Sequence, residues 1–138
     1  MNFDYYFEAF FALAGAFLSF FLGGLDGLMK LLLIFVILDQ ITGMMKALIL
    51  KKYSSAIGFH GIAKKVCMFI FVGMANIIDN EMLGHSEVLR DAVVMFYLAN
   101  EGLSIIENAI DMGAPIPEGL KERFMSWHNK NTPADKED

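Results

Sequence analysis

Long apolar runs constrain this chain more than any other feature of its sequence. Residues 3–22 and 28–50 each form a largely apolar stretch, and 56% of all 138 residues are hydrophobic. A helix of about 20 residues matches the thickness of the hydrocarbon core of a bilayer. Two further stretches, residues 62–78 and 88–112, follow them. The sequence therefore predicts an all-α integral membrane protein with about four transmembrane helices in two hairpins.

The four stretches differ in apolar length and polarity. Residues 3–22 lack the basic start of a cleavable signal peptide, and their hydrophobicity on all sides argues against the alternative of an interfacial helix. Residues 62–78 have an apolar centre of 13 residues, so they span only if the stems of Lys64 and Lys65 add to their length. Residues 88–112 contain many polar side chains, which a transmembrane helix must hide from lipid.

Basic residues gather around one connection. Positive charge marks the cytoplasmic side of a membrane protein, so the connection between the second and third spans should be cytoplasmic and both termini should lie inside. The opposite connections carry only acidic charge and should be external. The basic residues are Lys46, Lys51, Lys52, Lys64 and Lys65, and the acidic ones are Asp26, Asp79, Glu81 and Glu87.

The C-terminal part is predicted to be a cytoplasmic tail, residues 118–138, after a transmembrane domain of residues 1–117. Pro115 and Pro117 end the fourth helix. Residues 118–128 then place Leu120, Phe124 and Trp127 on one face of a short amphipathic helix that suits the headgroup region, with Trp127 read as an interface anchor rather than a ligand site. Beyond Asn129 the charged chain is expected to be disordered.

Asp39 lies near the middle of the second span and shares one helix face with Thr42, Gly43 and Lys46. A carboxylate near the bilayer centre costs about 2.5–3.5 kcal/mol on insertion scales, so Asp39 needs a partner, a water-filled lumen or another subunit. A hydrogen-bonded packing contact within one chain is the equally weighted alternative.

The fourth span carries a second polar face, formed by Tyr97, Glu101, Ser104 and Asn108, with Asn100, Glu107 and Asp111 on the neighbouring flank. Counting the helical rise places Glu101 at the depth of Asp39 and Glu107 at the depth of Lys46. We therefore expect a Lys46–Glu107 pair, and two carboxylates deeper in the membrane that share a proton or are separated by water. A conventional bundle with satisfied polar groups is the alternative.

The basic connection is predicted to be a tight interfacial hairpin in which lysines meet anionic headgroups and glycines form the turn. Nucleic-acid binding is the disfavoured alternative for such a loop. Its candidate residues are Lys51, Lys52, Ser55, Gly58, Gly61, Lys64 and Lys65.

Neither metal nor enzyme chemistry is expected. The single cysteine, Cys67, excludes an intrachain disulfide, and the three histidines are too isolated to form a metal site. No nucleophile and base are suitably placed, so the sequence predicts neither catalysis nor a cofactor.

Four motifs resemble, in order and spacing, the toxin-secretion and phage-lysis holins of Gram-positive bacteria, over residues 28–125. The resemblance implies a protein of the bacterial cytoplasmic membrane that forms homo-oligomers among membrane lipids. It also implies lesions through which an endolysin or a toxin escapes as cargo, and an antiholin as a further partner. A small ion channel or an antiholin-type regulator is the alternative. The motifs are Asp39-x-x-Thr42-Gly43-x-x-Lys46-Ala47, Ser55-x-x-Gly58-x-x-Gly61-x-x-Lys64-Lys65, the run 100–108 (Asn-Glu-Gly-Leu-Ser-Ile-Ile-Glu-Asn) and Gly113-x-Pro115-x-Pro117.

Overall fold

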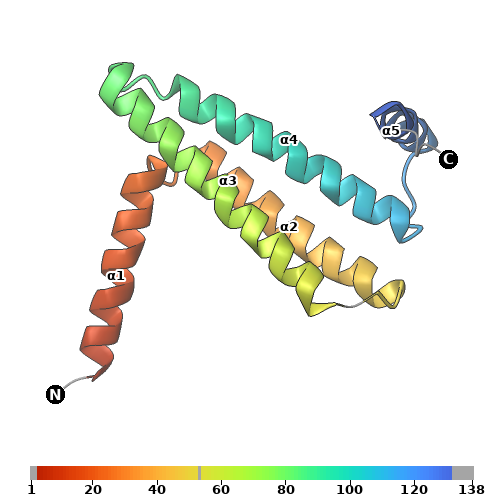
Figure 1. Cartoon of the computed structure of the whole chain (residues 1–138), viewed down its shortest axis with the longest axis horizontal. Coiled ribbons are helices and arrows are strands. Elements are labelled where there is room, and N and C mark those ends of the chain that lie inside the picture. Colours follow the sequence, from red (N-terminus) through yellow and green to blue (C-terminus); the bar gives the residue numbers. More distant parts are fainter. Residues whose placement is uncertain (1–2, 53, 132–138) are drawn as a thin grey trace, which may run out of the picture.

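The computed structural model describes residues 3–52 and 54–131, and every secondary-structure element in those ranges is helical (Figure 1). The predicted all-α class is confirmed. By length and composition, α1, α2 and residues 58–82 of α3 are apolar enough to cross a membrane, whereas α4 with its charged residues falls outside that class. The helices are α1 (Phe3–Leu22), α2 (Gly27–Ile49), α3 (Ser55–Met82), α4 (Val88–Asp111) and α5 (Glu118–Asn131).

Three helices form the bundle, and α4 is its central element. It packs along both α2 and α3, while the direct contact between α2 and α3 is much smaller. The buried apolar core is formed by Met29 and Leu32 of α2, Met68 and Val72 of α3, and Val94 of α4. Close packing of such side chains, rather than escape from water, holds helices together in lipid.

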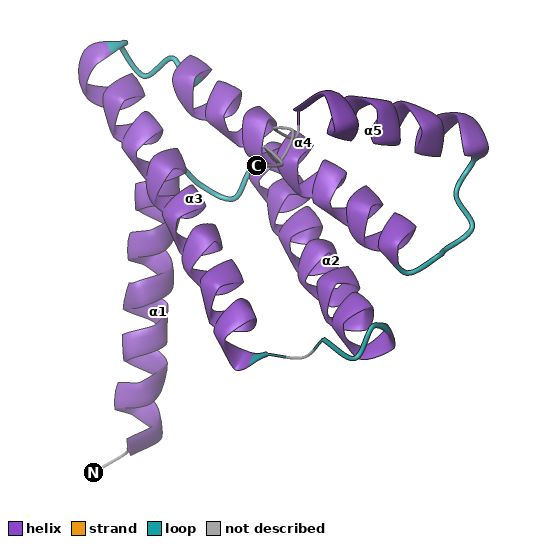
Figure 2. Cartoon of the chain, turned by 45° about the vertical axis from the view of Figure 1, so that its right-hand side comes forward, coloured by secondary structure: helices purple, strands orange, loops and turns teal. Residues whose placement is uncertain are grey.

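Helix α1 diverges from this bundle, as the two views in Figures 1 and 2 agree. None of its residues is buried, and its main contact is with α3 rather than α2. At that contact the ring of Phe21 occupies the space that a Cβ at Gly73 would need. The predicted pairing of the first two spans as a hairpin therefore differs from the structure, because the absence of a side chain at Gly73 lets the end of α1 pack against α3.

The connection from α1 to α2 turns through Gly23 and Gly24, whose φ angles of 80° and 93° are strained for other residues. Asp26 then starts α2 as its N-cap, since its Oδ1 accepts a hydrogen bond from the backbone N–H of Met29 at 2.9 Å.

Helix α3 begins at Ser55, earlier than the expected start at residue 62. Gly58, Gly61 and Lys65 consequently lie inside a helix, and the turn of the basic connection falls before them, where Lys51 has a left-handed φ of 52°. The expectation of a glycine turn, with Lys65 at the headgroups, is wrong. Lys65 has carboxylate partners inside the bundle, so it does not need to reach the membrane surface.

Helix α5 follows the loop that contains Pro115 and Pro117. It occupies the segment where the sequence predicts an amphipathic helix and continues to Asn131. Phe124 is buried, and its ring packs with those of Trp127 and His128. The rest of the expected disordered tail, from residue 132 onward, lies outside the described residues.

Candidate functional site

A charged cluster lies between the three bundle helices. The Lys65 Nζ of α3 is 2.7 Å from Oδ2 of Asp39 on α2 and 2.5 Å from Oε2 of Glu101 on α4. The three side chains are only 17%, 13% and 12% exposed, respectively. We call these residues the triad; one charged side chain from each bundle helix contributes to it.

Hydrogen bonds extend the triad toward the end of the bundle at which α2 and α3 are connected. The Asn108 amide donates to Oδ1 of Asp39 at 3.2 Å and to the Thr42 hydroxyl at 3.1 Å, and this hydroxyl donates to the backbone carbonyl of Asp39. Gly43 faces this amide; a Cβ added at Gly43 would lie 3.7 Å from Nδ2 of Asn108. Among the described residues, every buried side-chain nitrogen and oxygen atom has a hydrogen-bond partner.

The triad is not electrically neutral when all its groups are ionised. One ammonium faces two carboxylates, so one negative charge remains in a site that is largely closed to solvent. A charge in a low-dielectric site is stable only when a counter-ion, a proton or water compensates it. The three charged groups can therefore remain in a closed, dry site only when they are tightly paired. Water that enters the site would stabilise the remaining negative charge.

The structure brings together several residues that the sequence analysis selected on the second and fourth spans. Hydrogen bonds join Asn108 to Asp39 and Thr42, and Lys65 bridges Asp39 and Glu101, the two carboxylates that were expected to share a proton or be separated by water. Whether they line a lumen in an assembly stays a prediction.

Lys65 is the residue whose role the sequence analysis missed. Asp39 lies ten residues from the end of α2 (49 − 39), Lys65 ten from the start of α3 (65 − 55) and Glu101 ten from the end of α4 (111 − 101). At about 1.5 Å per residue all three have the same depth. The earlier start of α3 is the signal that would have revealed this match.

Lys46 pairs with Asp111 at 2.5 Å, so the expected Lys46–Glu107 pair is wrong. The one-turn step from Glu107 to Asp111 carries the carboxylate to the end of α4, where Lys46 reaches it. Glu107 itself is half-buried on the outer flank of α4, and Asn100 is exposed.

The remaining predicted site residues lie in the half of the bundle that contains the α2–α3 connection. Ser104 of α4 and Gly61 of α3 face a groove between α2 and α3, beside Gly43. The others are exposed; they are Lys51, Lys52, Ser55, Gly58 and Lys64.

A second polar cluster, which the sequence analysis did not anticipate, joins the opposite ends of the helices. The fully buried Arg90 side chain donates to the carbonyl oxygens of Leu22 and Gly24 and to the carboxylate of Asp26, with its closest contact to Asp26 at 2.7 Å. The Arg90 guanidinium lowers the pKa of Asp26 below its ordinary value of 3.8 through its hydrogen bond. Arg90 is the one lysine or arginine in the acidic segment 79–91, a signal that could have revealed it.

Helix α3 completes this second cluster. Asp79 accepts hydrogen bonds from the backbone N–H groups of Leu89 and Arg90 and so satisfies the start of α4. Asn76 donates to the carbonyl oxygens of Phe20 and Phe21 at 3.3 and 3.1 Å. The end of α1 is thereby attached to the corner of α3 and α4.

No group of three or more histidine, cysteine, aspartate or glutamate side chains within the described part of the chain could hold a metal ion. Cys67 is an exposed thiol on α3.

Comparison with known proteins supplies the family. Residues 16–129 match the bacteriophage holin family. The chain is 42% identical over 117 residues to an uncharacterised protein of Listeria monocytogenes, covering 85% of this chain and 83% of the relative. It is 40% identical over 96 residues to a probable holin of Bacillus phage phi105, covering 70% of each. No solved structure matches. The family match includes the whole of α2, α3 and α4 with all three triad residues, and the chain belongs to the bacteriophage holin family.

Proposed function

We propose that this protein is a holin, which assembles in the bacterial cytoplasmic membrane and opens lesions that release an endolysin, or a toxin, from the cell. The observation that carries the proposal is the family match over residues 16–129, together with the similarity to a probable phage holin. Holins are not enzymes. The endolysin or toxin is cargo that passes through the lesion, and its release requires no lasting binding site.

The proposal includes a crossing of the membrane by α4 as well as by the three apolar helices. The polar side chains of α4 support it, because Arg90, Glu101 and Asn108 point into the bundle and are hydrogen-bonded or ion-paired there. Exposed apolar side chains such as Met95 and Phe96 remain to face lipid. Four spans place both termini in the cytoplasm, given the basic connection between α2 and α3.

The triad provides a physical reason for two states. In a closed bundle its charges are paired and the protein tolerates surrounding lipid. When several copies surround water, the same charges are hydrated, so separating them costs far less than it would in hydrocarbon. A charged core of this kind favours either a closed bundle or a water-filled assembly over intermediates that expose it to lipid.

Inducible expression in a bacterium, with and without a cytosolic endolysin, tests this function. Turbidity, entry of a small dye and release of a large cytosolic enzyme are followed together. Abrupt endolysin-dependent lysis with enzyme release is the expected result. Dye entry without enzyme release would instead identify a small channel, and membrane insertion without leakage would identify an antiholin-type regulator.

A further inference from the structure

A groove lies between α2 and α3, where these two helices have little direct contact. Its volume is about 570 Å³, and Gly43 and Ala47 of α2 face Gly58 and Gly61 of α3 across it. Lys65 lies at its inner end, so the groove leads to the triad. A Cβ at Gly58 or Gly61 would meet no atom within 4 Å, which shows that this wall is open in the single chain.

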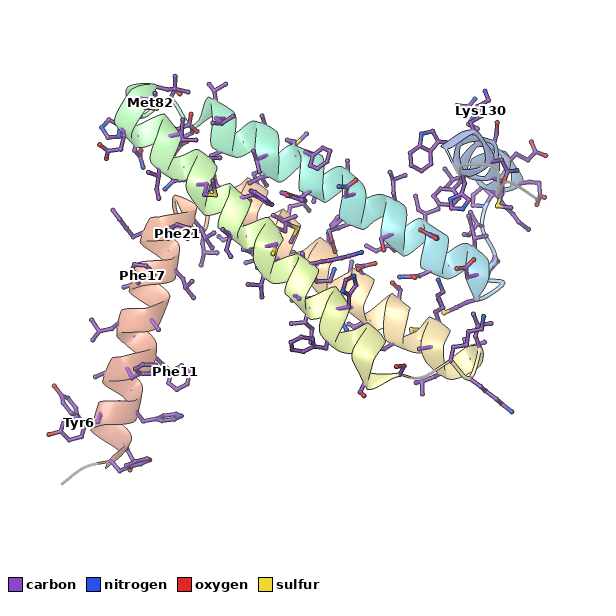
Figure 3. The ribbon with its side chains drawn as sticks, viewed as in Figure 1. Tyr6, Phe11, Phe17, Phe21, Met82 and Lys130 are labelled. Carbon is purple, nitrogen blue, oxygen red and sulfur yellow. The ribbon has the colours of Figure 1, made fainter. Side chains whose placement is uncertain are left out.

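Helix α1 is the unpartnered helix of the same chain. Only its last turns contact the bundle, where Leu18, Phe21 and Leu22 lie against α2 and α3. Its earlier part stands away from the bundle, as the labelled Tyr6, Phe11 and Phe17 show in Figure 3. The small residues Ala12, Gly15 and Ala16 lie in this free part and permit close approach of another helix.

Charge is complementary between the free end of α1 and the mouth of the groove. Asp4 and Glu8 lie in the first two turns of α1, and Lys51, Lys52 and Lys64 lie around the start of the groove. None of these five side chains forms an ion pair within the described residues. In Figure 1 the N-terminus lies at the lower left and the α2–α3 connection at the lower right, so the acidic start of α1 is far from the lysines at the groove of its own chain.

We propose that α1 of one copy lies in the groove between α2 and α3 of a neighbouring copy. The inference rests on the proposed function, because it names the contact through which a holin would assemble. The α1 helix does not enter the groove of its own chain, because Phe21 packs on Gly73 and Asn76 donates hydrogen bonds to the end of α1. An arm that enters the groove of the next copy makes a head-to-tail contact, and such contacts extend into rings or open arrays.

Placing α1 in the groove brings matching residues together. All copies share one membrane orientation, so the acidic start of a neighbour's α1 lies at the depth of the groove's lysines. Ala12, nine residues from the start of α1, then lies near the depth of Ile62, seven residues from the start of α3. The arm also covers the cytoplasmic side of the triad.

Disulfide crosslinking tests this contact in the full-length protein in bacterial membranes. In a Cys67→Ala background, one copy carries Ala12→Cys and a differently tagged copy carries Ile62→Cys. Oxidation is expected to join the two tagged copies. The control replaces Ile62→Cys with Phe96→Cys, an exposed residue on the outer face of α4. Crosslinking equal to this control would overturn the proposal, and so would crosslinking only within a chain that carries both cysteines.

A groove-filling variant provides the second measurement. A Cβ at Gly61 meets no atom within 4 Å in the single chain, and the leucine of Gly61→Leu would extend into the groove, so this variant is expected to lower the crosslinking yield about tenfold. Gly27→Leu is the matched control, because this exposed glycine also has open space and lies outside the groove. Equal yields in the two variants, with the same thermal unfolding midpoint, would contradict the proposal.

The lysis assay separates the two proposals. Lysis without crosslinking would leave the holin function standing and remove this contact. Crosslinking at the groove without lysis or leakage would retain the contact and remove the lytic function.

Discussion

Lys65 and its two carboxylates show how a charged side chain fits inside a membrane helix. Each partner comes from a different helix, so the ion pairs form only when α2, α3 and α4 have the right depth and rotation. Desolvation cancels much of the energy gained by such pairs, whereas a broken pair leaves a buried charge without compensation. The triad therefore contributes more to the uniqueness of the packed arrangement than to its net stability.

Lys65→Met tests this asymmetry. It leaves two buried carboxylates without their cation, so we expect the free energy of unfolding to fall by about 3–5 kcal/mol. Denaturant titration of the purified protein in detergent measures the change. Lys64→Met is the matched control, since Lys64 is exposed and unpaired in the described structure, and its effect should stay within about 0.5 kcal/mol. Equal effects of the two variants would refute the structural role of the triad.

Removing all three charges of the triad should restore most of the unfolding free energy that Lys65→Met loses. In the triple variant Lys65→Met, Asp39→Asn, Glu101→Gln the triad carries no charge, so most of the unfolding free energy lost in Lys65→Met should return. The same titration measures it. Additive loss from the three substitutions would mean that the three side chains do not act as one unit.

The Asp26–Arg90 contact predicts that the stability of the folded protein falls at low pH. Because the pKa of Asp26 is lowered in the folded protein, its contribution to stability is present above its ordinary pKa of 3.8 and is lost as pH falls through the lower folded value. Wild type should therefore unfold at a higher temperature than Asp26→Asn at neutral pH, and the two midpoints should converge in strong acid. A difference between the midpoints that does not change with pH would contradict this.

At the scale of the helices, α4 is polar along one side and apolar along the other. Arg90, Glu101 and Asn108 project toward α2 and α3 or their connections, while Met95 and Phe96 are exposed on the opposite side. This reverses the pattern of a helix in a water-soluble protein and is the pattern expected if α4 crosses the membrane as proposed. Two neighbouring helices must therefore accompany α4 to satisfy its polar side.

The crossing of α1 and α3 depends on one glycine. A Cβ at Gly73 would overlap the ring of Phe21, so Gly73→Ala should displace the end of α1 and cost about 1–3 kcal/mol of unfolding free energy. Gly58→Ala is the control, because its Cβ meets nothing within 4 Å and alanine favours a helix. Adding Phe21→Ala to Gly73→Ala should recover part of the loss, and the absence of recovery would argue against this contact.

At the scale of the whole molecule, the chain is a three-helix bundle with one free arm. Polar groups hold the bundle at three levels: the triad lies near mid-length, the Lys46–Asp111 pair lies at one end and the Arg90 cluster lies at the other. The apolar core around Leu32, Met68 and Val94 lies between the triad and the Arg90 cluster. Such a protomer is closed by itself, and it still presents an apolar helix and a groove for assembly.

Cysteine labelling tests the proposed topology with four spans. In a Cys67→Ala background, Glu81→Cys should react with a membrane-impermeant maleimide added to intact cells before dye entry begins. Lys52→Cys and Lys121→Cys should react only after the membrane is permeabilised, because both positions are cytoplasmic when α4 crosses. Labelling of Lys121→Cys from outside would show that α4 does not cross the membrane.

Residue order and spacing alone predict the class of the protein and the approximate positions of its helices, apart from the early start of α3. Apolar runs of bilayer length specify helices in lipid, and the expected spans 3–22 and 88–112 agree closely with α1 and α4. The depth of Asp39 and Glu101 also follows from counting residues along helices. These properties are local, so they can be derived from order and spacing alone.

The way in which the helices pack selects the partner of each polar side chain. Lys65 could meet headgroups or carboxylates, and the rotation of α3 against α2 and α4 selected the carboxylates. In the same way, Gly73 allows α1 to pack on α3 rather than on α2. Arg90 donates to the carbonyl oxygen of Gly24, which lies 66 residues away in the α1–α2 connection. Such choices depend on how helix faces meet in three dimensions, and one-dimensional periodicity does not contain that information.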